Sequence, residues 1–303
     1  MGRLEKGRWI VEDVISKSDD GEFKRQEQKF REMKIIPEKD RYHLYVSYAC
    51  PWAHRSLIMR KLKNLEDIIS VTVVSPYMME DGWIFNGTDP VFQKECLREV
   101  YTEVDPDFSG RVTVPVLLDK KTKRIVNNES EDVIRILNDG FNELTGNADD
   151  YYPKNFRDEI HEVNEDIYHN INNGVYKTGF ATRQDAYDAN VKKLFEALDR
   201  VEKRLEGKKF LVGDRLTEAD IRFYTTLVRF DAVYYVHFKC NRTMIREFKN
   251  LSRYLKDLYE MEAFKSTTHF DHIKAHYYYS HRQINPYRIV PLGPCPLVAS
   301  MSK

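Results

Sequence analysis

The sequence has few cysteines, no excess of either charge and no long apolar run, and each shortage excludes a class of protein. Only four of the 303 residues are cysteine, and they are widely separated. The chain therefore lacks the disulfide framework of a small secreted domain. Lys plus Arg and Asp plus Glu each total 48, so no net charge attracts nucleic acid or anionic lipid. We expect no nucleic-acid partner.

The hydrophobic segments are short. The longest β-branched run, residues 68–74, has the length of a strand and not of a membrane-spanning helix. The first residues lack the apolar core and the cleavage site of a secretory signal. We therefore expect a cytoplasmic protein without membrane association. With 42% apolar and 32% charged residues, the chain suits one large or two ordinary globular domains.

Residues 41–74 have the pattern of a β-α-β unit. Residues 41–49 alternate in polarity, as a strand does. Residues 51–63 carry apolar side chains at helical spacing behind a first-turn proline. The run at 68–74 is typical of a buried parallel strand.

A second group of elements follows an irregular stretch, residues 75–110. Two strands, 112–118 and 124–126, flank a polar turn and predict an antiparallel hairpin. An amphipathic helix then begins at Glu129-Ser130. Together with the β-α-β unit, these elements predict an α/β domain.

From about residue 155 the pattern is helical throughout. Thr217 to Asp220 has the spacing of a capping box. We expect helices over four segments: 156–172, 184–205, 217–238 and 243–260. The expected parts are an N-terminal arm (1–38), an α/β domain (39–150), an all-helical domain (151–265) and a C-terminal tail with little periodicity (266–303).

Cys50 is the first candidate for chemistry, because it ends a strand and is followed by Pro51 and a helix. Unpaired N–H groups and the helix dipole favour an anion there, and such positions lower the pKa of a thiol from about 8.5 to roughly 3.5–7.5. A buried, inert cysteine is the alternative. No cysteine lies three residues further on, so a reactive Cys50 would work as a single thiol through mixed disulfides.

Two further sequences suit a peptide-like ligand. If the Val114–Pro115 bond is cis, the Val114 amide is exposed to pair with such a ligand; the alternative is a plain edge-strand proline. Glu129 and Ser130 at a helix start can hold the ammonium and carboxylate of an α-amino acid. The alternative for this pair is a simple helix cap.

These motifs together resemble the glutathione transferases, over nearly the whole chain. The longer strings that carry the resemblance narrow it to the Xi class, the glutathionyl-hydroquinone reductases: Cys50 to Arg55, Gly82 to Phe85, Arg111 to Val116, Val126 to Ser130, Asn172 to Lys177, His276 to Tyr278 and Ile284 to Pro286. The resemblance implies the glutathione transferase fold, with a thioredoxin-like N-terminal domain and an all-α C-terminal domain. It also implies a homodimer.

The resemblance also implies residue roles. Cys50 would be the nucleophile, and Tyr176 the proton donor. Tyr234 and Tyr277 would be phenols near the thiol, although each of the three tyrosines could instead serve only in packing. The residues implied to bind glutathione are Trp83, Arg111, Val112, Thr113, Val114, Glu129 and Ser130.

The implied reaction is the glutathione-dependent reduction of S-glutathionyl-hydroquinones to hydroquinones, through a mixed disulfide between Cys50 and glutathione. An Omega-like thioltransferase or dehydroascorbate reductase is the nearest alternative, and a non-catalytic scaffold of the same fold is a third. We expect no metal, and interpret His276 and His281 as ordinary polar or packing residues.

Overall fold

The computed structural model describes residues 2–12 and 20–298, and these residues form two compact units. The first unit contains residues 2–12, 26–149 and 267–283. The second contains residues 20–25, 150–266 and 284–298. The expected arm and the expected tail are thus each divided between the two units. Each unit is described by itself below.

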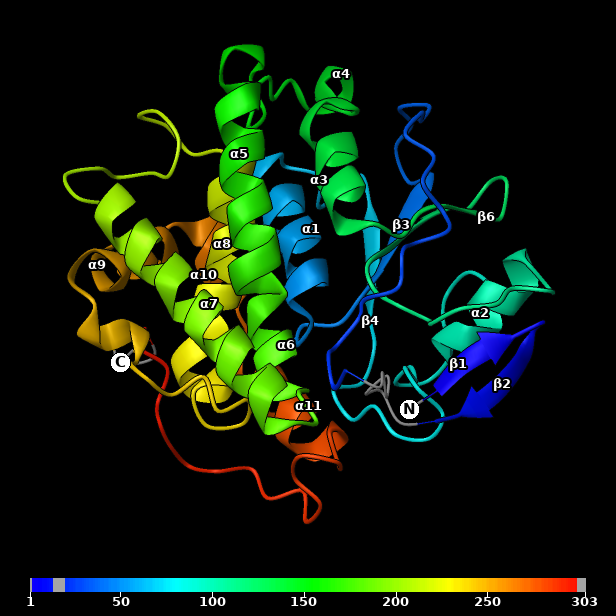
Figure 1. Ribbon diagram of the computed structural model, residues 1–303. Helices are drawn as coiled ribbons and strands as arrows, with labels where there is room; N and C mark the ends of the chain where they lie inside the picture. Colours follow the sequence, from blue (N-terminus) through cyan, green and yellow to red (C-terminus); the bar gives the residue numbers. More distant parts are fainter. Residues whose placement is uncertain (1, 13–19, 299–303) are drawn as a thin grey trace. The chain divides into compact units, whose positions relative to one another are not determined.

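The first unit is built on a mixed four-stranded sheet in the order β4-β3-β5-β6 (Figure 1). The strands are β3 (Tyr42–Val46), β4 (Ser70–Val73), β5 (Val116–Asp119) and β6 (Arg124–Asn127). β3 pairs in parallel with β4 and antiparallel with β5, which pairs antiparallel with β6. This confirms the β-α-β unit and the hairpin. The expectation that β4 is buried is wrong, because it is an edge strand whose residues are only half-buried.

Two helices pack together on one side of this sheet, and a third lies on the other side (Figure 1). α1 (Pro51–Leu62) and α3 (Ser130–Asp139) form the first pair, and α2 (Leu97–Val104) is the third helix, while the short α4 (Asn142–Thr145) follows α3. The sequence pattern did not predict α2. Its capping box uses Cys96 and Glu99, and cysteine is not a residue that normally signals a helix start.

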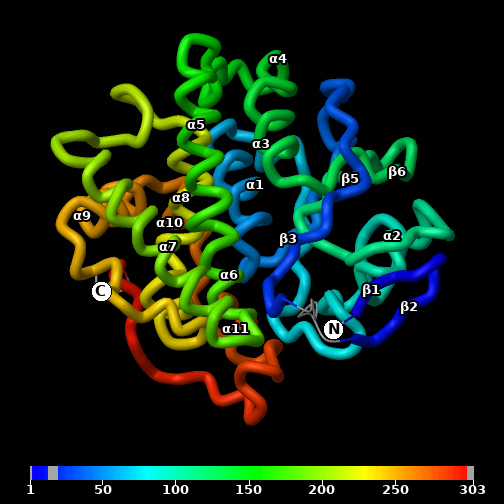
Figure 2. The backbone as a smooth tube through the Cα atoms, viewed as in Figure 1, coloured from blue at the N-terminus to red at the C-terminus, as the bar shows by residue number. Residues whose placement is uncertain are grey.

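The terminal segments of the first unit are more regular than the sequence predicts. β1 (Gly2–Glu5) and β2 (Arg8–Val11) pair as a hairpin (Figure 2) whose turn residues Lys6 and Gly7 both have positive φ. α11 (Phe270–Ser280) lies where a tail with little periodicity was expected. That expectation is wrong because α11 is half-buried or buried on nearly all sides, so its apolar and polar residues do not separate into two faces.

The second unit is helical. The expected helices are confirmed, although two of them continue as π-helical turns and smaller helices were missed. Thr217 and Asp220 form the predicted capping box. The helical elements of the second unit are η1 (Lys154–Phe156), α5 (Arg157–Ile167), η2 (Tyr168–Asn172), α6 (Gly174–Gly179), α7 (Gln184–Arg204), α8 (Glu218–Arg229), η3 (Phe230–Tyr234), η4 (Ile245–Glu247), α9 (Lys249–Tyr259) and α10 (Glu262–Lys265).

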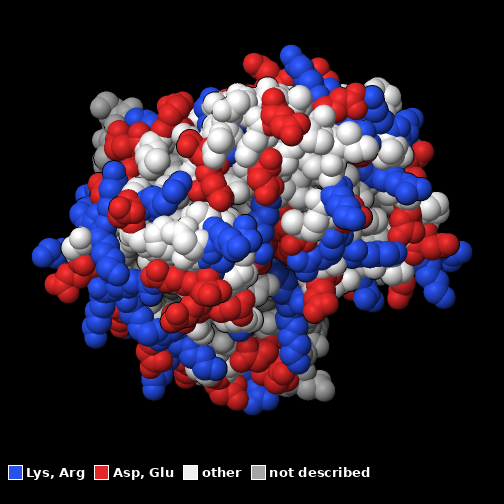
Figure 3. Space-filling view, turned by 90° about the horizontal axis from the view of Figure 1, so that it is seen from above, with Lys and Arg blue, Asp and Glu red and all other residues white. Residues whose placement is uncertain are grey.

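The charged side chains on the face shown in Figure 3 are of both signs and intermixed. This agrees with the equal totals of basic and acidic residues in the sequence.

Candidate functional site

Cys50 is the N-cap of α1, with Pro51 as the first helical residue. Its backbone is extended (φ −74°, ψ 123°), as is usual at an N-cap, and it lies at the end of the helix where first-turn N–H groups have no acceptor within the helix. The thiol is half-buried and donates a hydrogen bond to the carbonyl oxygen of Val114 over 3.6 Å. Two residues that the sequence singled out separately are therefore neighbours.

The other three cysteines lie in different environments. Burial raises the pKa of the Cys96 thiol to about 11, and burial also raises the pKa of Cys240. Cys295 is exposed. Cys96 and Cys240 are thus buried, as the alternative interpretation expected of Cys50. Cys50 itself is partly exposed and lies at a helix N-terminus.

The Val114–Pro115 peptide bond is cis. The edge-strand alternative is wrong, because Pro115 directly precedes β5, which is an internal strand. A proline before the first strand residue removes no hydrogen bond from the ladder. No residue in the described part of the chain accepts a hydrogen bond from the Val114 N–H.

Glu129 is the N-cap of α3, which confirms the helix-cap interpretation for this residue. Its carboxylate accepts hydrogen bonds from the Glu131 N–H and from the Ser130 hydroxyl, both over 3.3 Å. The Ser130 Oγ in turn accepts from Nη1 of Arg55 over 3.2 Å. Arg55 is 1% exposed and its guanidinium lies 4.4 Å from the ring centroid of Trp52. No role was predicted for Arg55, because only the packing of α1 on α3 brings it to Ser130.

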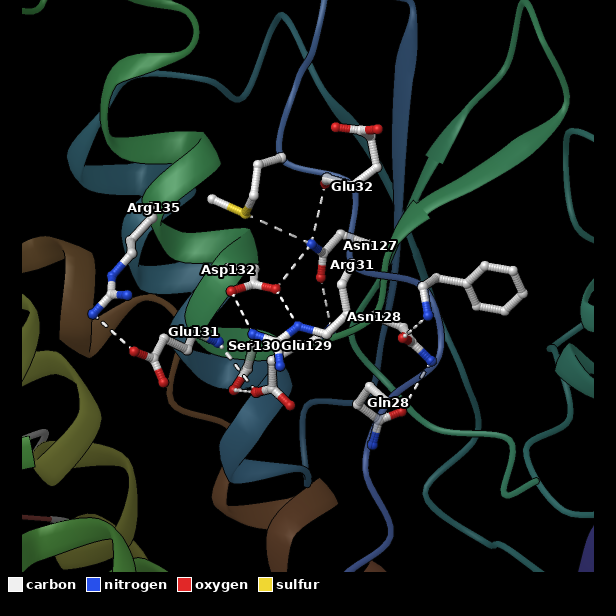
Figure 4. A network of polar contacts seen from close by, with 12 residues as sticks. Gln28, Arg31, Glu32, Asn127, Asn128, Glu129, Ser130, Glu131, Asp132 and Arg135 are labelled. Carbon is white, nitrogen blue, oxygen red and sulfur yellow. Dashed lines mark hydrogen bonds and ion pairs between the residues drawn. The ribbon is translucent and has the colours of Figure 1, made fainter. Parts of the chain in front are cut away.

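A segment of the N-terminal arm also contacts the start of α3 (Figure 4). Arg31 donates two hydrogen bonds to the carboxylate of Asp132, over 2.6 and 2.8 Å. The Gln28 amide oxygen accepts from Asn128 Nδ2 and from Thr113 Oγ1, both over 2.9 Å. Sequence reasoning missed these residues, because the partners are about 100 positions apart and the arm has no periodicity to signal them.

The implied ligand residues 111–113 are largely engaged within the protein. The Arg111 N–H donates to Gln26 Oε1 over 3.2 Å, and its guanidinium lies 3.7 Å from a Glu12 carboxylate oxygen. The Val112 side chain belongs to the core. The Thr113 carbonyl oxygen accepts from the Tyr101 hydroxyl over 2.9 Å. In this stretch, the N–H groups of Val112 and Val114 have no acceptor among the residues that the structure describes, whereas those of Arg111 and Thr113 donate within the protein.

Trp83 lies on an irregular segment between β4 and α2. Its carbonyl oxygen accepts from the Leu97 N–H at the start of α2, over 2.9 Å. Its ring is stacked on His276 of α11, with centroids 4.9 Å apart and an interplanar angle of 22°. His276 is thus a packing residue, as the sequence interpretation has it, and its packing partner is a candidate ligand residue.

The structure brings Tyr176 and Tyr234 together in the second unit, with ring centroids 6.2 Å apart. Both pack against Phe238, which is stacked on Tyr234. Tyr234 ends the π-helical turn η3 and Tyr176 follows the π-helical turn η2; such turns are frequent at functional sites. The guanidinium of Arg25 lies 5.0 Å from the Tyr176 ring centroid.

Tyr277 belongs to the first unit, as Cys50 does. It lies on α11, is 1% exposed, and has His281 perpendicular to its ring at 5.5 Å.

Within the described residues no group of three or more His, Cys, Asp or Glu side chains could hold a metal ion. In the same part of the chain, no helix is both long and apolar enough to cross a membrane.

A helix-capping cysteine beside a cis-proline loop, on a thioredoxin-like sheet in a chain with a second, helical unit, defines a glutathione transferase. Two family models match the chain: the glutathione S-transferase N-terminal domain over residues 49–139, and the C-terminal domain over residues 184–257.

Known proteins resemble the chain over nearly its whole length. Glutathionyl-hydroquinone reductase YqjG of Escherichia coli is 50% identical, over 97% of this chain and 95% of that protein. Glutathione S-transferase omega-like 2 of Schizosaccharomyces pombe is 52% identical, over 93% of this chain and 96% of that protein. The crystal structure of the glutathione-S-transferase Xi from Phanerochaete chrysosporium is 53% identical, with a TM-score of 0.91 and coverage of 93% of this chain and 96% of that one.

A glutathione-bound structure of YqjG is also similar, with 54% identity, a TM-score of 0.84 and coverage of 86% of this chain and 87% of that one. The chain belongs to the glutathione S-transferase family, in its Xi class.

Proposed function

We propose that this protein is a glutathionyl-hydroquinone reductase whose nucleophile is Cys50. The relative YqjG carries that activity in its name and is 50% identical over almost the full length of both chains. The observation that carries the proposal is the placement of the Cys50 thiol, half-buried at the N-terminus of α1 and hydrogen-bonded to the Val114 carbonyl. A helix N-terminus stabilises a thiolate, which is the reactive form.

Glutathione would bind in the first unit. The Val114 N–H, which has no acceptor in the described part of the protein, would pair with the peptide backbone of glutathione. Ser130 at the start of α3 would receive the α-carboxylate of the γ-glutamyl group, and Glu129 its ammonium. Trp83 and Arg111 would contact the rest of the tripeptide. Val112 and Thr113 would contribute main-chain shape, because their side chains are engaged within the protein.

In the first half-reaction Tyr176 donates a proton to the ring carbon that carries the sulfur while the neighbouring hydroxyl loses its proton, which gives the keto tautomer of the glutathionylated hydroquinone. The Cys50 thiolate then attacks the sulfur, the S–S bond forms as the carbon–sulfur bond breaks, and the electron pair moves through the ring onto the carbonyl oxygen. The ring leaves as the hydroquinone phenolate, which takes up a proton on oxygen. Tyr234 and Tyr277 would be further phenols that assist this reaction.

In the second half-reaction a thiolate of free glutathione attacks the mixed disulfide at the glutathione sulfur. Oxidised glutathione leaves and the Cys50 thiolate is regenerated, so two thiols supply the two electrons that reduce the substrate. No metal takes part in this scheme.

An Omega-like thioltransferase or dehydroascorbate reductase is the second candidate function. The 52% identity to a protein named omega-like 2 favours it. This activity needs the same thiolate but no acid to protonate a carbon. A non-catalytic scaffold would need neither.

We also propose that the protein acts in the cytoplasm as a homodimer. All four cysteines lie in the described part of the chain and none forms a disulfide there, as expected in a reducing compartment. The dimer follows from the resemblance to the Xi class.

Steady-state rates with two substrates separate these functions. Tyr176→Phe should lower kcat with glutathionyl-menadiol about 10²- to 10⁴-fold, because a positioned acid is lost. It should change the rate with a glutathione mixed disulfide less than about threefold, because a thiolate leaves without protonation of carbon. Unchanged turnover of glutathionyl-menadiol would remove Tyr176 from the acid role. Wild-type turnover of the mixed disulfide alone would establish the Omega-like function, and turnover of neither substrate the scaffold.

A further inference from the structure

The segment that carries Trp83, residues 76–85 (the Trp83 loop), contains no helix or strand. It forms a few backbone hydrogen bonds of its own, such as that from the Gly82 N–H to the Met79 carbonyl oxygen over 3.1 Å. Besides the start of α2, whose Leu97 N–H donates to the Trp83 carbonyl oxygen, two further elements outside the four-stranded sheet contact the loop, and both belong to the same unit as the loop.

The first is α11, which is about 200 residues further along the chain. His276 is 7% exposed and its ring is stacked on the indole of Trp83. Nδ1 of His276 is hydrogen-bonded to the carbonyl oxygen of Pro76 over 2.9 Å, which fixes the plane of the imidazole. One turn further on, Ser280 Oγ accepts from the Met78 N–H over 3.1 Å. The helix thus binds both the main chain of the loop and its indole.

The second is the β1–β2 hairpin. Trp9 donates its indole N–H to the carbonyl oxygen of Glu80 over 2.8 Å. Gly82 has a φ of +73°, and a Cβ there would lie 3.0 Å from the Trp9 ring, so the hairpin packs directly on the loop backbone. The hairpin thus contacts Gly82, the residue before Trp83. The ring stacked on the Trp83 indole is that of His276.

The indole N–H of Trp83 has no acceptor among the residues that the structure describes, so stacking and packing hold the ring, and His276 is its stacking partner. We propose that His276 is a positioning residue of the glutathione site, which holds the Trp83 indole so that its N–H can donate to a carboxylate of glutathione. This inference rests on the proposed function, because it takes glutathione as the ligand of Trp83.

The matched pair His276→Phe and His276→Leu separates stacking from simple packing. Both variants lose the hydrogen bond to Pro76, but only phenylalanine keeps a flat ring against the indole. Binding of S-methylglutathione, which cannot react with Cys50, is measured by titration calorimetry on the full chain. We expect His276→Leu to weaken binding about tenfold, and His276→Phe to stay within about threefold of the wild type.

A double-mutant cycle with Trp83→Phe is the second measurement. That variant lacks the indole N–H, so adding His276→Leu should weaken binding less than about twofold further. In His276→Leu the KM for glutathionyl-menadiol should rise, and kcat should change much less than KM, because the glutathionyl group of this substrate occupies the site beside Trp83. His276→Met repeats the measurement with a side chain that fills more space if the leucine variant does not fold.

Equal binding by the phenylalanine and leucine variants, whether weakened or not, would overturn the inference. So would full additivity in the cycle. Failure of the proposed function is a separate result: the wild-type protein itself would not bind S-methylglutathione.

Discussion

Cys50 and Cys96 each precede a helix, but they differ in how far they are buried. Cys96 is 5% exposed, and burial raises the pKa of its thiol to about 11. Cys50 is half-buried and reaches the Val114 carbonyl. The position at a helix start could be predicted from the sequence for Cys50, but not for Cys96. Exposure could not be predicted for either, because it depends on loops that pack against the helix start.

His43 shows how burial creates a pH dependence of stability. It is 1% exposed on β3, with its ring nitrogens hydrogen-bonded to the hydroxyls of Ser70 and Thr72 on the neighbouring strand. Burial lowers the pKa of His43 to about 4, against about 6.5 in an unfolded chain. Above pH 6.5 the ring is neutral in both states. Between pH 6.5 and 4 the unfolded chain takes up a proton that the folded chain does not.

The free energy of unfolding should therefore fall as the pH drops through this window, by up to about 3 kcal/mol from this one group. His43→Gln should lower stability at pH 7 and flatten the dependence between pH 6.5 and 4. Urea unfolding at several pH values measures both. A stability difference between wild type and variant that stays constant across this range would contradict the assignment.

At the scale of elements, the start of α3 shows how the N-terminal arm supports the candidate site. Asp132 is buried beside Arg31, and its carboxylate also accepts from Asn127 Nδ2 over 3.2 Å. Arg31→Met should lower the free energy of unfolding by about 1 kcal/mol, because the arginine is half exposed and solvent screens the pair. Thermal or urea unfolding measures the loss.

Arg183→Met is the matched control for that prediction. Its ion pair with Asp185 has similar geometry, but both side chains are more than half exposed. We expect a change within about 0.3 kcal/mol. Equal losses in the two variants would show that the arm contributes nothing specific at α3.

The elements that could be predicted are those with their own periodicity or cap. α1 has a strand before it and a proline at its start, and α8 has the capping box of Thr217 and Asp220. α11 and the β1–β2 hairpin could not be predicted. Their stability comes from contacts with distant segments, such as His276 with Trp83 and Trp9 with Glu80.

In the candidate site too, residues in local motifs could be predicted and residues that depend on distant contacts could not. Cys50, Val114 and Glu129 were found from local motifs, and the structure places Cys50 and Val114 in contact. Gln28, Arg31 and Arg55 were not assigned, because each meets its partner only through the fold.

At the scale of the whole molecule, the chain passes several times between its two units. The arm and the tail each contribute to both units. In the first unit they supply Arg31 and His276 to the surroundings of the candidate glutathione site, and in the second unit Arg25 lies over the Tyr176 ring. Segments that look like accessory extensions in the sequence therefore contact several of the candidate residues, among them Trp83, Thr113 and Tyr176.

The most direct test of the account traps the first half-reaction. Wild-type protein is mixed with glutathionyl-menadiol in the absence of free glutathione, and the products are measured by mass spectrometry. The account predicts one menadiol released for each glutathionyl group bound, with that group on Cys50, and neither product from Cys50→Ala. Release of menadiol without labelling of Cys50, or equal release by Cys50→Ala, would contradict it.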